Sequence, residues 1–362
     1  MKRLSTMQLL PGMVVARDVL SYDRQLVMAS GTVLTDRAIT KLDLYGILTV
    51  FVEEVLIENT SPSSPDEDAN MPSYSERIQN SPVFKRFKAD YELNVATFKD
   101  ALNNVVERNI ALDVNSLLQQ TLDMIAAGRG QIGILDMLQN MREYDDSTFT
   151  HSLNVGLICN VLATWLKLTK EQIEMATACG LFHDIGKLTI PHAIITKPGK
   201  LDAHEYALVQ KHPINGYQLL QAQDVDEHVR NAALMHHERS DGSGYPMRLS
   251  GKQIDPYARL VAIADVYDAM TAARVYRGPL CPFRVIEIFE QEGFEKYDVE
   301  FLLVFLENVV NTYIRNCCRL SNGATAEIVF INKDRLSRPI VRCGDTIINL
   351  AERPDLSIEE LL

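Results

Sequence analysis

The sequence lacks the cysteine pattern of a disulfide-stapled protein. Its six cysteines contain no C-x-x-C pair and fit no regular disulfide spacing. The first ten residues lack the apolar core of a secretory signal, and no uninterrupted apolar run is long enough to span a membrane. These absences predict a protein of the reducing cytoplasm with no membrane span. We expect the adjacent Cys317 and Cys318 to lie at a buried helix end and not to form a redox pair.

Positive charge is scarce as well. The chain has 36 lysines and arginines against 48 aspartates and glutamates, which gives a formal net charge of -12. Binding of DNA or RNA usually shows as a basic patch or stripe. We therefore expect no polymeric nucleic acid as a partner. A small phosphodiester stays compatible with this charge, because a few local cations and metal ions are enough to hold it.

The length and composition allow more than one folding unit. A chain of 362 residues, 46% of them hydrophobic, can form two or three such units. Residues 1–57 predict a small α/β module. Its strands are expected at 13–20, 26–33 and 48–55, and its helix at 35–45. Residues 58–73 contain proline, serine and acidic residues and almost nothing apolar, which indicates a linker.

The pattern becomes helical over residues 82–315. Two capping-box signatures, Thr169-x-x-Gln172 and Asp202-x-x-Glu205, indicate helix starts within this stretch. Residues 316–362 then predict a β-rich segment, with a hairpin turn at Asn322-Gly323. The expected fold is therefore mainly α, an all-helical domain flanked by the small α/β module and the short β-rich segment.

The histidines are gathered in one part of the chain. A lone histidine is usually a surface residue or a hydrogen-bonded core residue, but several of these stand beside other metal-ligating residue types. All eight lie between positions 151 and 237, namely His151, His183, His192, His204, His212, His228, His236 and His237. The clustering favours a metal site for some of them.

His183 and Asp184 are adjacent within the run GLFHDIGK. Adjacent side chains on a helix point about 100° apart. One imidazole and one carboxylate can therefore reach two neighbouring metals, with the carboxylate bridging them. Lys187 lies four residues beyond His183, on the same helical face, and can place an ammonium beside a bound phosphate.

A second group follows an apolar helix. His236-His237-Glu238 runs into the loop DGSGYP, whose glycines and proline predict a tight turn that presents Tyr245. Paired imidazoles suit iron, manganese, zinc or nickel. His212 precedes a proline, a position disfavoured in helix, so we expect it at a kink.

Two further pairs share helical spacing. Asp265 and Asp268 are three residues apart, so their carboxylates share a face. Arg274 and Arg277 have the same spacing, and their guanidinium groups can form a fork for phosphate or base edges.

Together these motifs resemble the HD-GYP family. The runs GLFHDIGKLTIP, ITKPGKL, HHERSDGSGYP and ARLVAIADVYDAMTAARVYR match it in order and spacing over about residues 148–277. The resemblance implies an all-helical domain with a two- or three-metal centre. It also implies hydrolysis of cyclic di-GMP to linear pGpG or to GMP by metal-activated water, with cyclic GMP-AMP as the substrate of some members.

Carried over residue by residue, the resemblance implies three roles. It implies these metal ligands: His151, His183, Asp184, His212, His236, His237 and Asp265. Asp184 bridges the metals, and Lys187 is the catalytic residue beside the scissile phosphate. The resemblance also implies that five residues hold the substrate, namely Gly244, Tyr245, Asp268, Arg274 and Arg277. Members with three metals have a glutamate where this chain has Ser147, so we expect two divalent ions, iron, manganese or another transition metal.

Three functions stay open at this point. The first is a cyclic dinucleotide phosphodiesterase, and the second is a non-catalytic cyclic dinucleotide-binding adaptor. The presence of every expected metal ligand favours the first over the second. The third, another phosphohydrolase of the HD superfamily acting on mononucleotides, is disfavoured by the paired histidines and the GYP loop. The apolar residues around Met270 and at 301–310 fit either a core or a dimer surface. A homodimer and a signalling partner protein therefore both stay open.

Overall fold

The structure is a computed structural model. It describes residues 2–362 except 6–8, 10–12, 21–25, 35–37, 39–41, 43–48, 53–73, 109, 129–132, 142–147, 198 and 273–279. The chain divides into two compact units, Met1–Met71 and Pro72–Leu362. The expected linker at 58–73 and most of the expected helix at 35–45 fall outside the described residues.

The first unit contains two small antiparallel strand pairs. Strand β1 (Lys2–Ser5) pairs with β4 (Thr49–Val52), and β2 (Val19–Leu20) pairs with β3 (Leu26–Met28). Strands β2, β3 and β4 lie within the ranges that the sequence predicts, whereas β1 was not predicted. Apolar side chains form the core of this unit, among them Leu9, Val15, Val27, Leu34, Leu42, Val50 and Val52.

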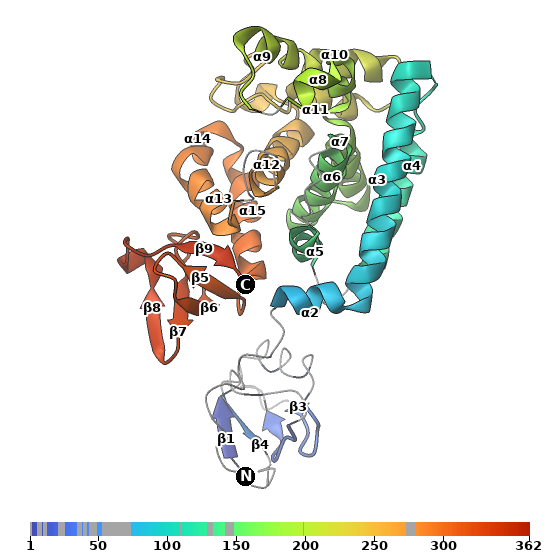
Figure 1. Ribbon diagram of the computed structural model, residues 1–362. Helices are drawn as coiled ribbons and strands as arrows, with labels where there is room; N and C mark the ends of the chain where they lie inside the picture. The colour runs from blue at the N-terminus through green and yellow to red at the C-terminus, as the bar shows by residue number, and fades with distance from the viewer. Residues whose placement is uncertain are drawn as a thin grey trace. The chain divides into compact units, whose positions relative to one another are not determined.

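The second unit begins with a largely helical part, as expected. Its helices in chain order are α2 (Tyr74–Asn80), α3 (Pro82–Arg108), α4 (Val114–Gly128), α5 (Ile134–Asn140), α6 (Thr148–Trp165), α7 (Lys170–Phe182), η3 (Ile185–Thr189), α8 (His192–Ile195), α9 (Ala203–Val209), α10 (His212–Gln221), α11 (Glu227–Met235), η4 (Gly251–Gln253), α12 (Pro256–Thr271), α13 (Pro282–Ile288), η5 (Phe289–Gly293), α14 (Phe294–Lys296) and α15 (Val299–Thr312). Helices α6, α7 and α12 pack against one another at the centre (Figure 1).

Local signals place several of these helices. Both predicted capping boxes are present, at Thr169 for α7 and at Asp202 for α9. Helix α6 buries residues around most of its circumference, the polar Ser152 and Asn160 among them, so it differs from an amphipathic surface helix. Helix α10 begins at His212, after a break that follows α9, so the predicted kink is confirmed.

A five-stranded antiparallel sheet completes the second unit. Its strands lie in the order β8 (Thr346–Asn349), β7 (Ile340–Cys343), β6 (Thr325–Phe330), β5 (Cys317–Leu320) and β9 (Ile358–Leu361). The predicted turn at Asn322-Gly323 joins β5 to β6, and Gly323 has a φ of 83°. The expectation of a helix end at Cys317 and Cys318 was wrong, because both pair with β6.

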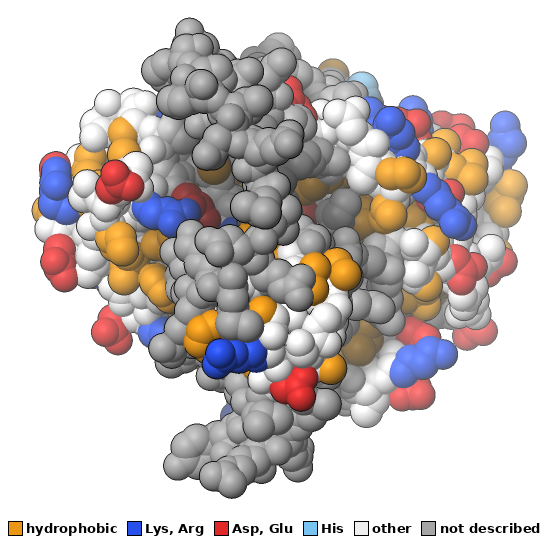
Figure 2. Space-filling view, turned by 90° about the horizontal axis from the view of Figure 1, so that it is seen from below, with side chains coloured by type: hydrophobic (Ala, Val, Ile, Leu, Met, Phe, Trp, Pro, Cys, Tyr) orange, Lys and Arg blue, Asp and Glu red, His pale blue; other side chains and the backbone are white. Residues whose placement is uncertain are grey.

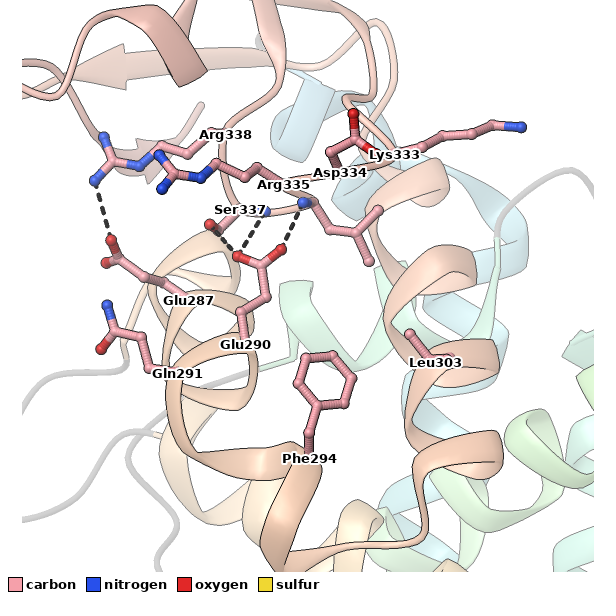
Figure 3. Close-up of a pocket in the computed structure, with 11 residues that line it drawn as sticks. Glu287, Glu290, Gln291, Phe294, Leu303, Lys333, Asp334, Arg335, Ser337 and Arg338 are labelled. Carbon is pink, nitrogen blue, oxygen red and sulfur yellow. Dashed lines mark hydrogen bonds and ion pairs between the residues drawn. The ribbon is translucent and has the colours of Figure 1, made fainter.

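The sheet and the helices share one hydrophobic core. Polar contacts also join them, as Figure 3 shows at a pocket beside the segment 333–338. Glu290 of η5 accepts hydrogen bonds from the backbone N–H of Leu336, at 2.6 Å, and from the Ser337 hydroxyl. Arg338 donates to Glu287 of α13 at 3.0 Å. The sheet is therefore fixed to the helices by both apolar and ionic contacts.

Two surface expectations can be compared with the structure. Helix α15 buries Leu302, Phe305, Leu306, Val309 and Val310, so the apolar residues at 301–310 contribute mainly to the core. Among the described residues, no helix combines the length and apolarity needed to cross a membrane. On the face that Figure 2 shows, Lys and Arg side chains are interspersed with Asp and Glu.

Candidate metal centre

The structure brings the seven expected ligands together from five places in the fold. His151 lies on α6, Asp265 lies on α12, and His212 is the first residue of α10. The remaining four stand where a helix ends: His183 and Asp184 follow α7, and His236 and His237 follow α11. These chain segments are far apart in sequence, and the packing of the helices makes their side chains converge.

The ligands form two groups on either side of Asp184. One group is His212, His236 and His237, and the other is His151, His183 and Asp265; within each group the ligand atoms lie within 4.8 Å of one another. Asp184 Oδ1 is 3.3 Å from His212 Nε2 and 3.6 Å from His236 Nε2. Asp184 Oδ2 is 3.3 Å from His183 Nε2. One carboxylate therefore faces both groups.

Backbone carbonyls orient three of the histidines. The Nδ1 atoms of His183, His212 and His236 lie 2.8 Å from Gly180 O, 2.6 Å from Val209 O and 3.0 Å from Ala233 O. A carbonyl oxygen can only accept, so each Nδ1 carries the proton and each Nε2 presents a lone pair. This is the arrangement that metal-ligating histidines adopt in proteins.

The lone pairs meet in a buried space that suits a cation. The Nε2 atoms of His212 and His236 are only 3.2 Å apart, and both are acceptors in this tautomer. Among the residues that the structure describes, His183 Nε2 and Asp184 Oδ1 are buried and find no hydrogen-bond partner. Buried acceptors without a donor are costly. Divalent cations in the two ligand groups would satisfy these four atoms, so the residues fit a metal.

The electrostatics favour the metal-binding protonation states of His236, His237 and Asp184. Burial lowers the pKa of His236 to about 4 and brings the pKa of His237 well below its usual range. Burial alone would raise the pKa of Asp184, but the charges of Lys187 and His183 outweigh it and hold the pKa well below its usual range. Neutral imidazole and ionised carboxylate are the forms that bind metal.

Lys187 and a glycine complete the HD segment. The Lys187 ammonium donates to Asp184 Oδ2 at 2.5 Å, from the short helix η3. Next to it, a Cβ on Gly186 would lie 2.0 Å from the His212 carbonyl oxygen. Only glycine permits this approach, so Gly186 lets η3 pack directly on the start of α10. The contact brings Asp184 and Lys187 to His212.

The loop after α11 is held against the paired histidines. Glu238 is 2% exposed and accepts from the backbone N–H groups of Met247, at 2.6 Å, and Leu249, at 2.9 Å. The Tyr245 ring stacks on His237, with centroids 4.7 Å apart. A Cβ on Gly244 would lie 2.5 Å from the Glu238 Cα. No role for Glu238 was predicted from the sequence, although its place directly after two candidate ligands was a signal.

Comparisons with known proteins identify the family of this chain. Residues 116–301 match the model of the HD domain family. This chain belongs to the HD domain family. A cyclic di-GMP phosphodiesterase of Pseudomonas aeruginosa, PA4108, is 43% identical over 141 residues, which are 39% of this chain and 34% of that protein. The 3'3'-cGAMP-specific phosphodiesterase 1 of Vibrio cholerae is 44% identical over 145 residues, 40% of this chain and 34% of that one.

The match to these curated relatives spans about a third of their length. Among solved structures, Bd1817, an HDG"Y"P protein from Bdellovibrio bacteriovorus, aligns with a TM-score of 0.54 at 17% identity. The alignment covers 85% of this chain and 99% of that chain. It shows a shared fold. The expected resemblance to HD-GYP proteins is confirmed by the family, the relatives and this fold.

Of the remaining expected substrate residues, the structure describes Asp268 but not the two arginines. Asp268 was expected to hold substrate, but it is 2% exposed and both its carboxylate oxygens are engaged. Oδ2 lies 2.7 Å from His151 Nδ1, and Oδ1 accepts from Asn154 at 3.1 Å. Asp268 therefore lies behind the candidate ligand His151, with both carboxylate oxygens already engaged. Arg274 and Arg277 lie outside the described residues, as does Ser147.

Three histidines stay apart from the HD domain's metal centre, as expected. His192 and His204 are exposed, and His228 pairs with Asp255 at 2.7 Å. At the centre itself, burial alone would lower the pKa of His151, but hydrogen bonds to Asp265 and Asp268 raise it to about 9. A metal that binds His151 Nε2 therefore displaces a proton from that nitrogen.

Proposed function

We propose that this HD domain hydrolyses a phosphodiester bond of a cyclic dinucleotide. The observation that carries the proposal is the pair of ligand groups that share Asp184, because two adjacent cations are a common device for phosphodiester hydrolysis. The names of the relatives supply the substrate class. Cyclic di-GMP is the first candidate, and 3'3'-cGAMP is the second, since the Vibrio cholerae relative that is 44% identical is named for it.

The proposed ligands are the seven residues that converge around Asp184, and they are expected to hold two divalent ions of the iron or manganese type. Imidazole and carboxylate together suit several such ions, which is why the metal identity stays open. When bound, the ions would supply a water of lowered pKa and would offset negative charge on the phosphodiester. Asp184 would help to hold both ions, because one of its oxygens faces each ligand group.

Lys187 is the proposed catalytic residue of the chain itself. Its side chain is 24% exposed, so the ammonium reaches the edge of the centre while it is held by Asp184. From there it can donate to a phosphoryl oxygen and offset the charge that develops during cleavage. Tyr245, stacked on His237, offers an aromatic face for a base, and the backbone at Gly244 sets the position of that ring. Arg274 and Arg277 stay proposed phosphate-binding residues.

The test is turnover by protein purified anaerobically with Mn²⁺ or Fe²⁺. Cyclic di-GMP and 3'3'-cGAMP are followed by chromatography, and metal content is measured in the same samples. We expect two metals per chain and a linear dinucleotide product. Asp184→Ala should lose both metal and turnover. His228→Ala, which removes a histidine outside the centre, should keep both.

Two results would contradict the proposal. Tight metal binding without turnover of either dinucleotide would favour a non-catalytic adaptor. Hydrolysis of mononucleotides alone would favour a different phosphohydrolase of the HD superfamily. The ratio of the two dinucleotide turnover rates decides which messenger is preferred.

A further inference from the structure

A chain of hydrogen bonds leads from the metal centre to a helix outside the family match. The HD domain match begins at residue 116, whereas α3 ends at Arg108. Tyr91 of α3 donates through its hydroxyl to Asn154 Oδ1 at 2.6 Å. Asn154 of α6 donates through Nδ2 to Asp268 Oδ1 at 3.1 Å, and Asp268 Oδ2 lies 2.7 Å from His151 Nδ1.

The direction of each bond is fixed by chemistry. An ionised carboxylate only accepts, so the amide nitrogen of Asn154 must face Asp268 and its oxygen must face Tyr91. The tyrosine hydroxyl therefore donates. His151 Nδ1 must donate to the other oxygen of Asp268, which leaves Nε2 for the metal side. Reversing the Asn154 amide would set two acceptors against each other at Asp268 and would break the chain.

The hydrogen bond that orients His151 differs in kind from those that orient the other histidines. His183, His212 and His236 donate to backbone carbonyls three residues before them, and each of these carbonyls belongs to the helix that precedes the histidine. His151 lies within α6 and donates to a side chain from α12. A side chain can rotate, so its position depends on what holds it. Asn154 and Tyr91 supply that support, and Tyr91 is 6% exposed.

We propose that Asn154 and Tyr91 are positioning residues for the ligand His151, so that α3 contributes to the metal centre from outside the matched domain. The inference rests on the proposed metal centre. It predicts an asymmetry between the two cations: only the group that contains His151 depends on this chain of hydrogen bonds. The group of His212, His236 and His237 does not touch it.

The experiment measures metal affinity, which needs no turnover. Chelator-treated full-length protein is titrated with Mn²⁺ against a competing fluorescent chelator, for wild type, Tyr91→Phe and Asn154→Ser. Loss of a residue behind a metal ligand typically weakens binding about 10- to 100-fold. We expect about 10-fold weaker binding of one Mn²⁺ per chain in Asn154→Ser, and about 3-fold in Tyr91→Phe, which is further away. The second Mn²⁺ should bind as in wild type.

The matched control is Asn160→Ser. Asn160 is a buried asparagine on the same helix and donates to Thr177, with no link to the centre. It should leave both affinities unchanged while it disturbs α6 similarly. If Tyr91→Phe and Asn154→Ser bind Mn²⁺ as tightly as wild type, the inference is wrong but the proposed function stands. The same holds if Asn160→Ser weakens Mn²⁺ binding as much as Asn154→Ser does. A wild-type protein that binds no Mn²⁺ would overturn the proposed function, and the inference with it.

Discussion

The buried carboxylate of Glu238 provides a direct test of how the loop after α11 is held. Glu238→Gln keeps the size of the side chain but replaces one acceptor oxygen with a donor. Glu238 accepts two backbone N–H groups, from Met247 and Leu249. The amide of glutamine can accept only one of them, and its NH₂ group then faces the other. Losing one charge-assisted hydrogen bond costs ~1.5–3 kcal/mol, and the remaining bond becomes a weaker neutral one.

We therefore expect Glu238→Gln to lower the free energy of unfolding by about 3 kcal/mol. Urea unfolding of chelator-treated protein measures it without a contribution from bound metal. Asp241→Asn is the matched control: Asp241 lies in the same loop and accepts from Ser243 at 2.9 Å, but it is exposed. Its change should stay within about 0.5 kcal/mol. A Glu238→Gln protein as stable as this control would refute the reasoning.

Three further predictions follow from other parts of the molecule. Lys187→Met should keep its metal but lose about 100-fold in kcat, measured with metal content fixed, and unchanged kcat would exclude a catalytic ammonium. Burial alone would raise the pKa of Glu287, but hydrogen bonds from arginines outweigh it and lower the pKa. The ionised Glu287 carboxylate therefore stabilises the folded protein fully above about pH 4.3, and this stabilisation is lost as the pH falls through the lowered pKa. Thermal unfolding should therefore show Glu287→Gln as destabilised at pH 7, with a smaller difference at pH 3; an equal difference at both values would contradict this. Mass spectrometry after thiol labelling should find the exposed Cys317 modified in the folded protein and Cys159, whose thiol pKa burial raises, modified only after unfolding.

The local pairing of the candidate ligands could be predicted from the sequence. His183-Asp184 and His236-His237 are adjacent pairs, so each pair brings two candidate donors to one helix end without any knowledge of packing. The proline after His212 marks the helix start that presents this side chain. These signals depend only on residues that are neighbours in the sequence, and such residues stay neighbours in the folded chain.

The supports of the centre could not be predicted, because their partners are distant in the chain. Asn154 and Asp268 are 114 residues apart, and Tyr91 and Asn154 are 63 apart. Asp268 shares the helical face of Asp265, which made substrate contact a reasonable expectation, yet its burial against His151 depends on the packing of α12 on α6. Strand β1 was missed for the same reason, since its pairing with β4 joins the two ends of the first unit.

The close approach at Gly186 has a consequence for how this protein can diverge. The distance between the Asp184 segment and His212 is set by two backbones in contact, with no side chain between them. Core side chains elsewhere can be exchanged during evolution and repack without altering that distance. Any side chain at position 186 would change it at once. This dimension of the centre therefore depends on a position that carries no reactive group.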